Sequence, residues 1–177
     1  IAVRLVGSEM CIRDRCDIVN YSLSKIIKPD IEIESVNSLD REALDKIKEK
    51  YGIEGVILDI DDTLREDMKS IPRCNEEWLE TLKSELKVVV LSNGIDEKIQ
   101  KFLQEKEISY IGFAMKPLKR SFKKACKIMN LPQDKVLVIG DSIFCDIHGG
   151  NRNNMKTVRI NKNINKKNIN ESERKER

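Results

Sequence analysis

A short apolar run that ends in acids is the feature that most constrains how this chain can fold. Residues 55 to 64 read GVILDIDDTL, and the apolar residues have the pattern of a strand buried on both faces. Asp59 and Asp61 lie two residues apart, so on an extended backbone their side chains share a face. Two carboxylates this close resist joint ionisation unless a cation lies between them. Taken alone, the motif fits a polar strand end entering a solvated loop equally well.

Three later stretches place further reactive side chains where predicted strands end. KVVVLS ends in Ser92, FAMKP places Lys116 before a proline that we expect to start a helix, and KVLVIGDSIFCD carries Asp141 and Asp146. The carboxyl ends of parallel strands open onto one crevice, where ligands bind. The sequence therefore predicts that these side chains converge on Asp59.

Together, these stretches resemble the four motifs of the haloacid dehalogenase superfamily of phosphotransferases: DxDxT, a strand-end Ser or Thr, a Lys, and GDxxxxD. The chain has all four in the order of that family. The resemblance implies that Asp59 is the nucleophile and forms an aspartyl-phosphate. It also implies that Asp61 is the general acid and then the base for water. The spacing alone does not separate these two roles.

The resemblance also implies roles for the other motif residues. Ser92, with Asn93 beside it, would bind a phosphoryl oxygen of the substrate, and Lys116 would neutralise developing charge and keep the nucleophile ionised. His148, the only histidine, is expected to be structural or exposed, and Cys145 an inert packed thiol.

An oxygen-rich acidic site favours Mg²⁺ as the cofactor, because Mg²⁺ prefers carboxylate ligands and retains water. In the family the metal takes the side chain of the first aspartate, the carbonyl oxygen of the second and the acid of the fourth motif. A further acid of that motif would be a direct or an outer ligand. The residues that these positions imply here are Asp59, Asp61, Asp141 and Asp146.

The motif spacing leaves no room for a cap domain. Residues 64 to 71 alone separate the first motif from Pro72, and residues 93 to 115 suffice only for one helix and one strand. We therefore expect an open site. An open site suits a phosphate presented on something large, or closure by a partner subunit; the motifs do not specify the oligomeric state.

The closest resemblance is to subfamily IIIA of the YqeG type, related to the phosphatidylglycerophosphate phosphatases of bacteria and mitochondria. It spans residues 29 to 160 and includes LSNG, KP and GDSIFCDIHGGNRN. In GGNRN, a glycine turn with Asn151 as a cap explains the residues equally well. The resemblance implies a phosphatidylglycerophosphate phosphatase of phospholipid synthesis. Two alternatives are a capless phosphatase acting on phosphoprotein, nucleic-acid ends or sugar phosphate, and a non-catalytic phosphate-binding or assembly protein.

The order of predicted elements indicates an α/β fold with a doubly wound, Rossmann-like parallel sheet of five strands, of the haloacid dehalogenase type and without a cap. We expect helices from a cap at Ser38 to Tyr51, over residues 75 to 85, after Asn93-Gly94, and from Pro117 onward. The strands are predicted within residues 55–60, 87–91, 109–113, 136–139 and 157–160.

Four segments are expected along the chain. Residues 1–15 lack both helical and strand periodicity and are expected to be a non-native or disordered leader without function. Residues 16–52 are expected to form a helical extension that packs on the phosphatase domain, residues 53–160. Residues 161–177 are expected to be a basic, disordered tail. From Lys156 to Arg177, eight Lys or Arg and three Glu give +5, whereas the whole chain is +3.

Composition narrows the class and location of the protein. With 40% hydrophobic and 36% charged residues, the chain is typical of globular domains, and no apolar run approaches the ~20 residues of a membrane span. Five scattered cysteines without CxxC spacing favour reduced thiols in the cytoplasm. No aromatic-spaced basic patch predicts nucleic-acid binding. Attraction of the basic tail to anionic lipid would place the protein peripherally at the inner face of the membrane. The expected ligand is a phosphorylated substrate.

Overall fold

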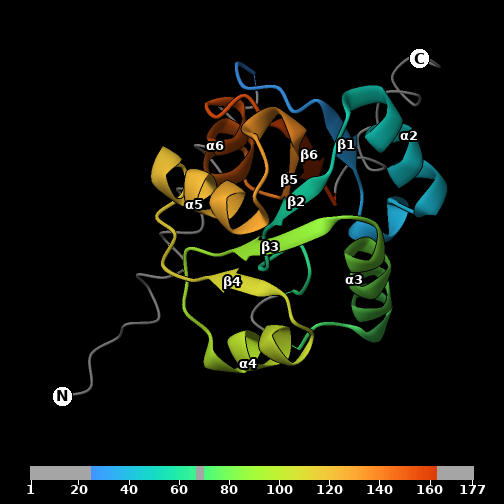
Figure 1. The fold of residues 1–177 in the computed structure, drawn as a ribbon, viewed down its shortest axis with the longest axis vertical. Helices are drawn as coiled ribbons and strands as arrows, with labels where there is room; N and C mark the ends of the chain where they lie inside the picture. Colours follow the sequence, from blue (N-terminus) through green and yellow to red (C-terminus); the bar gives the residue numbers. More distant parts are fainter. Residues whose placement is uncertain (1–24, 67–69, 163–177) are drawn as a thin grey trace, which may run out of the picture.

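Six parallel strands form one sheet at the centre of the protein (Figure 1). The computed structural model describes residues 25–66 and 70–162. Across the sheet, the strand order is β1-β6-β5-β2-β3-β4. The strands are β1 (Ile31–Ile33), β2 (Gly55–Leu58), β3 (Lys87–Leu91), β4 (Ser109–Ile111), β5 (Val136–Gly140) and β6 (Lys156–Ile160).

Helices connect these strands and cover the sheet. The longer ones are α2 (Arg41–Tyr51), α3 (Arg73–Glu85), α4 (Glu97–Glu105) and α5 (Lys119–Met129). A π-helical turn (Ile143–Ile147) leads directly into the short helix α6 (His148–Asn151). Two 3₁₀ turns span Val36–Ser38 and Gln133–Lys135.

The central strand β2 is buried on both faces, as its continuous apolar sequence predicts. It pairs in parallel with β3 on one side and β5 on the other. Val56 and Leu58 pack in the core cluster with residues of α2, α3 and α4, whereas Ile57 packs in the cluster with α5. Figure 1 shows α5 and α6 gathered apart from α2 and α3. The fold is therefore the predicted doubly wound α/β type.

The prediction of five strands was wrong, because β1 adds a sixth. It pairs with β6, opposite Val158 to Ile160. The Asp30 carboxylate fixes this edge by accepting bonds from Thr157 N at 2.9 Å, Thr157 Oγ1 at 3.0 Å and Lys156 Nζ at 2.8 Å. The expected helical extension thus contributes a strand as well as α2. Three residues are too few to show a strand periodicity, and their partners lie far along the chain.

Two predicted helix starts were also wrong. The N-cap of α2 is Asp40 rather than Ser38, and its carboxylate accepts a bond from Ala43 N at 2.9 Å. Gly52 ends this helix with a φ of 67°, the left-handed conformation that glycine adopts readily. Pro117 does not begin α5; it follows a cis peptide bond from Lys116, and the helix starts at Lys119.

Strand β4 ends two residues before the predicted Phe113, because Phe113 has a left-handed backbone with a φ of 51°. Among residues 25–66 and 70–162 no inserted domain covers the carboxyl edge of the sheet, in agreement with the predicted absence of a cap. None of the helices in these ranges is long and apolar enough to cross a membrane. The expected leader at residues 1–15 and most of the expected tail lie outside the described residues.

Candidate active site

The predicted site residues lie where strands end along the carboxyl edge of the sheet. Asp59 follows β2, Ser92 follows β3 and Asp141 follows β5, while Lys116 lies in the loop between β4 and α5. Because the strands are parallel, all these positions open on the same edge. The edge therefore brings together acids, a hydroxyl and an amine.

Lys116 is the ionic centre of this edge. Its Nζ donates to Asp59 Oδ1 at 2.5 Å and to Asp146 Oδ1 at 2.7 Å, and its side chain is only 3% exposed. Burial alone would lower the pKa of the Lys116 ammonium, but the charges of Asp146 and Asp59 outweigh burial and raise it. Lys116 therefore stays protonated and draws two acids together.

Three carboxylates meet around this lysine. Oxygen atoms of Asp59, Asp141 and Asp146 all lie within 4.8 Å of one another. Burial is the main cause that raises the pKa of Asp59 to about 7 and that of Asp141 to about 8, with the charge of Asp146 adding to both. One ammonium does not balance three carboxylates. The donor set thus fits a hard divalent cation, whose charge would lower these pKa values again.

The π-helical turn after β5 places Asp146 in the cluster. Ser142 Oγ accepts a bond from Cys145 N at 3.2 Å, and Ser142 N donates to Asp146 Oδ2 at 3.2 Å. A Cβ on Gly140 would lie 2.4 Å from the Asp146 carboxylate, so a larger residue would displace that acid. The glycine of GDSIFCD is therefore required by close approach of Asp146 to the backbone.

The Asp61 carboxylate is not part of the three-carboxylate cluster. It accepts a bond from Arg65 Nε at 2.9 Å and remains 45% exposed. Arg65, whose side chain is 4% exposed, also donates to Asp96 Oδ2 at 2.7 Å. Arg65 is not among the residues that the sequence predicts for the site. The spacing of four residues between Asp61 and Arg65 is the sequence signal for their ion pair. The contact of Arg65 with Asp96 has no such signal, because Asp96 lies far along the chain.

The turn that carries this motif is closed by one carbonyl. Ile60 O accepts bonds from the amides of Thr63, Leu64 and Arg65 at 3.3, 2.8 and 3.1 Å. Asp62 within the turn has a φ of 57°. Thr63 is buried, and its hydroxyl has no hydrogen-bond partner among the residues that the structure describes. The Thr63 hydroxyl therefore caps none of the described helices.

Ser92 and Asn93 occupy different positions in the crevice. Ser92 is buried, and its Oγ accepts a bond from Gly94 N at 3.1 Å. The Asn93 side chain accepts a bond from Lys116 N at 2.6 Å and donates to Lys116 O at 3.4 Å and to Cys145 Sγ at 3.7 Å. Asn93 therefore holds the loop that carries Lys116, a contact that its predicted place in substrate binding did not anticipate.

The GGNRN segment packs the fold rather than lining the crevice. A Cβ on Gly149 would lie 2.4 Å from the Phe122 ring, and one on Gly150 would lie 2.7 Å from Thr157. The Asn151 side chain accepts a bond from Thr157 Oγ1 at 3.3 Å and donates to Lys28 O at 3.1 Å. Close packing and this long-range link account for the segment.

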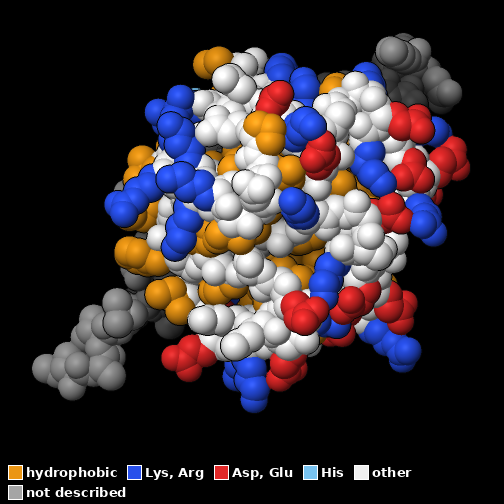
Figure 2. All heavy atoms as spheres, in the orientation of Figure 1, with side chains coloured by type: hydrophobic (Ala, Val, Ile, Leu, Met, Phe, Trp, Pro, Cys, Tyr) orange, Lys and Arg blue, Asp and Glu red, His pale blue; other side chains and the backbone are white. Residues whose placement is uncertain are grey.

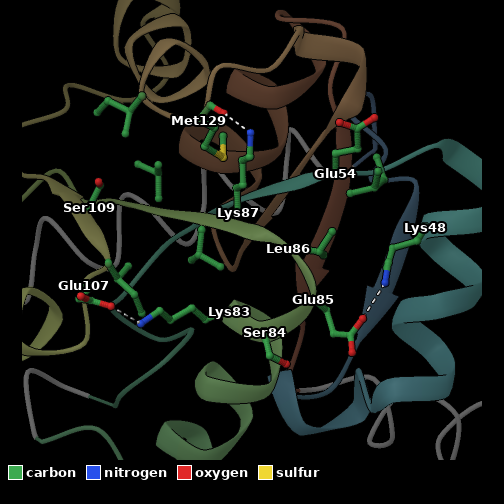
Figure 3. Close-up of a pocket in the computed structure, with 15 residues that line it drawn as sticks. Lys48, Glu54, Lys83, Ser84, Glu85, Leu86, Lys87, Glu107, Ser109 and Met129 are labelled. Carbon is green, nitrogen blue, oxygen red and sulfur yellow. Dashed lines mark hydrogen bonds and ion pairs between the residues drawn. The ribbon is translucent and has the colours of Figure 1, made fainter.

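A groove of about 610 Å³ lies at the opposite, amino edge of the sheet (Figure 3). Three cations (Lys48, Lys83 and Lys87) and three acids (Glu54, Glu85 and Glu107) line it, so the lining carries no net charge. Lys48 pairs with Glu85 at 2.8 Å and Lys83 with Glu107 at 3.5 Å. Lys87 donates to Met129 O at 2.9 Å. No excess charge is left to attract a ligand, so this groove does not compete with the carboxyl edge as the candidate site.

Comparisons with known proteins show the family of the chain. Residues 69–154 match the family model of the haloacid dehalogenase-like hydrolases. The chain is 33% identical over 141 residues to "Probable phosphatase YqeG" of Bacillus subtilis, which covers 78% of this chain and 79% of the relative.

Solved structures include more distant neighbours. An uncharacterized protein from Listeria monocytogenes matches with a TM-score of 0.49 and 20% identity, over 59% of this chain and 76% of its own. The cobalt-bound deoxy-D-mannose-octulosonate 8-phosphate phosphatase of Haemophilus influenzae matches with a TM-score of 0.43 and 19% identity, over 51% and 60%.

Proposed function

Because the chain belongs to the haloacid dehalogenase superfamily as a phosphatase of the YqeG type, we propose that it hydrolyses phosphomonoesters through an aspartyl-phosphate on Asp59, with Mg²⁺ as cofactor. The observation that carries this proposal is the buried contact of Lys116 with Asp59 and Asp146 beside Asp141. Such a cluster combines a nucleophile, a fixed positive charge and oxygen ligands.

The reaction has two half-reactions in this proposal. In the first, an Asp59 carboxylate oxygen bonds to phosphorus, the bond from phosphorus to the leaving oxygen breaks, and Asp61 gives that oxygen a proton. In the second, a water oxygen bonds to phosphorus, the bond to Asp59 breaks, and Asp61 takes the proton of the water. Inorganic phosphate leaves, and both aspartates return to their starting states.

Lys116 and Ser92 assist both half-reactions. Burial raises the pKa of Asp59 to about 7 even beside the ammonium of Lys116, so this contact is needed to keep the nucleophile ionised. The buried Ser92 hydroxyl, whose oxygen accepts a bond from Gly94 N, would donate its own proton to a phosphoryl oxygen. Charge placed in advance where it develops in the transition state lowers the barrier.

The cation would be held by the carboxylates of Asp59, Asp141 and Asp146, together with the carbonyl oxygen of Asp61. When bound, it supplies positive charge against the phosphoryl oxygens. The excess of acids over Lys116 at this edge supports a divalent cation, and the all-oxygen donor set supports Mg²⁺.

The proposed substrate is phosphatidylglycerophosphate. Support comes from the open carboxyl edge and from the resemblance to subfamily IIIA, whose relatives act on that lipid. A capless phosphatase acting on phosphoprotein, phosphorylated nucleic-acid ends or sugar phosphate remains the alternative, since it would use the same residues. A non-catalytic phosphate-binding or assembly protein is disfavoured because every motif residue is present.

A substrate panel tests this assignment. The purified chain is assayed with phosphatidylglycerophosphate in mixed micelles, a sugar phosphate, a phosphopeptide and a phosphorylated oligonucleotide, each with and without Mg²⁺. We expect the lipid to have the highest kcat/KM and no phosphate release without the metal. A preference for any of the other three substrates would overturn the lipid assignment. Phosphate release by Asp59→Asn equal to that of the wild type would overturn the mechanism.

A further inference from the structure

Large apolar side chains are exposed around the carboxyl edge of the sheet. They come from the loops after β3, β4 and β5, and Phe113 and Ile95 are each 66% exposed. Exposed apolar residues in one neighbourhood mark interaction surfaces more often than single ones do. This apolar rim consists of Ile95, Phe113, Met115, Leu118 and Phe144.

Hydrogen bonds join the loops that carry the apolar rim. Phe113 N donates to Gly94 O at 3.2 Å, which links the loop after β4 to the loop after β3. The Asn93 side chain contacts both Lys116 and Cys145, which links the same two loops to the turn after β5. The loops that carry the rim are thus joined to one another.

The backbone holds two rim residues outward in an unfavourable conformation. Phe113 and Met115 both have a φ of 51°, a left-handed region that bulky residues rarely adopt. Ala114 between them is buried. Such strain persists only where surrounding structure enforces it, and it clusters at functional sites. The loop therefore presents apolar side chains to solvent at the expense of its own stability.

A cationic face lies beside the apolar rim on α5, which begins directly after Leu118. The helix contains no acid, and no ion pair joins any of its cations to an acid of residues 25–66 or 70–162. Figure 2 shows blue side chains gathered over α5, with orange hydrophobic side chains next to them. This cationic face consists of Lys119, Arg120, Lys123, Lys124 and Lys127.

Most charges of this face do not stabilise the helix; the exception is Lys127 in the last turn, where the dipole favours a cation. Lys119 and Arg120 occupy the first turn, where the helix dipole disfavours cations, and neighbours three and four residues apart repel each other. In contrast, α2, α3 and α4 each have a glutamate in the first turn. An external anionic partner would give these cations a role.

We propose that the apolar rim and the cationic face dock the carboxyl edge on an anionic phospholipid bilayer. Apolar side chains that enter the headgroup region, flanked by cations that attract anionic lipid, are the combination that binds bilayer surfaces. Docking here brings the crevice of Asp59 and Lys116 against phosphate groups at the surface. The inference uses the proposed function only to identify that crevice as the catalytic one.

A bilayer fits this surface better than a nucleic acid does. Three rim residues, Ile95, Met115 and Leu118, are aliphatic, and single-stranded nucleic acid is bound mainly by aromatic stacking together with cations. Aliphatic side chains gain little from bases in solution but gain free energy on entering the acyl region.

Vesicle flotation with the full chain tests the proposal. We expect the protein to float with phosphatidylcholine vesicles that contain phosphatidylglycerol and to bind pure phosphatidylcholine vesicles far more weakly, with added salt weakening the former. Lys119→Gln with Lys123→Gln should weaken binding about thirtyfold. The matched control is Lys46→Gln with Lys50→Gln, which removes the same charge from α2 and should leave binding unchanged.

A second pair of variants tests the apolar rim. Phe113→Asn with Leu118→Ser should weaken binding at least about tenfold, because both apolar side chains are lost. Asn tolerates the left-handed backbone at 113, and Ser at 118 is a favoured N-cap for α5, so both substitutions suit the fold. Ile128→Ser is the control, since Ile128 is exposed at the amino edge.

Three outcomes would overturn the docking surface. The first is equal flotation with both vesicle types. The second is an equal loss of vesicle binding in the test and control variants. The third is binding to a single-stranded oligonucleotide that is tighter than binding to vesicles and that the same variants abolish. Hydrolysis of p-nitrophenyl phosphate without vesicles is measured in parallel. Its absence from the wild type would contradict the proposed function and would leave the vesicle result valid.

Discussion

The two edges of the sheet handle charge in opposite ways. At the amino edge, Lys48 and Lys83 meet Glu85 and Glu107 at the surface, so each charge has a counter-charge. At the carboxyl edge, three clustered carboxylates, two of them buried, have one ammonium among them, and it contacts only Asp59 and Asp146. Balanced ion pairs that are open to water contribute little to stability. An unbalanced cluster of carboxylates costs free energy, so we expect a protein to keep one only where it serves a function. The difference separates a supporting edge from a reactive one.

The largest effect should come from Asp59→Asn at the carboxyl edge. The amide keeps the shape of the side chain but cannot act as the nucleophile, so kcat should fall by at least about 10⁴. The measurement is steady-state hydrolysis of p-nitrophenyl phosphate, with thermal unfolding as the control for fold. A variant that is folded and retains a tenth of the activity would remove Asp59 from this role.

Removal of the metal should have the second largest effect on the rate of hydrolysis. Full chelation with EDTA should stop hydrolysis, because the carboxylates would repel a phosphate without a cation between them. Asp141→Ala should raise the Mg²⁺ concentration for half-maximal rate by about 100-fold. A titration of rate against Mg²⁺ measures both. The amino-edge variant Glu107→Ala is the control and should follow the wild-type curve; an unchanged curve for Asp141→Ala would exclude it as a ligand.

Arg65→Met should have the third largest effect, on stability. It leaves Asp61 and Asp96 without their shared partner, and because both carboxylates remain accessible to water, the loss should be about 2 kcal/mol, the range of a hydrogen bond to a charged group. Urea unfolding measures this loss, and kcat should also fall because Asp61 is no longer held. Arg41→Met is the matched control, since Arg41 is 73% exposed in its pair with Glu85. Equal effects of both variants would contradict the contrast between the two edges.

The smallest effect should come from Glu85→Gln at the amino edge, and it should depend on pH. The hydrogen bond and charge of Lys48 lower the pKa of Glu85. A lowered folded-state pKa stabilises the protein above the ordinary glutamate value, and this contribution is lost as pH falls through the folded-state pKa. The variant should therefore unfold slightly earlier in urea at neutral pH and together with the wild type in strong acid. A difference that grows in acid would contradict this assignment.

The sequence was most informative where burial dominates. Strand β3 has the predicted bounds and β5 extends one residue further, because strands buried on both faces are continuous apolar runs. The motifs also predicted a common edge for Asp59, Lys116 and Asp146, because parallel strands leave few alternatives for where their ends meet. Both predictions depend on local sequence and general topology.

The sequence was least informative where distant residues decide a side chain's surroundings. Arg65 is buried because it meets Asp96, and Asp30 fixes β1 through Thr157; neither contact has a local signature. The left-handed Phe113 also lies in a segment whose apolar residues look like the end of a strand. Tertiary contacts override local pattern at each of these positions.

The pairing of β1 with β6 has a consequence for the order in which the protein is synthesised. Ile31 lies opposite Val158, so the first described strand of the sheet can pair only after the last one has been synthesised. Strands β2, β3, β4 and β5 are complete once Gly140 has been added. On a ribosome, this four-stranded part can assemble while β6 is still unmade. During that interval the outer edge of β5 is open, and a nascent chain in this state is a natural client for chaperones that cover strand edges.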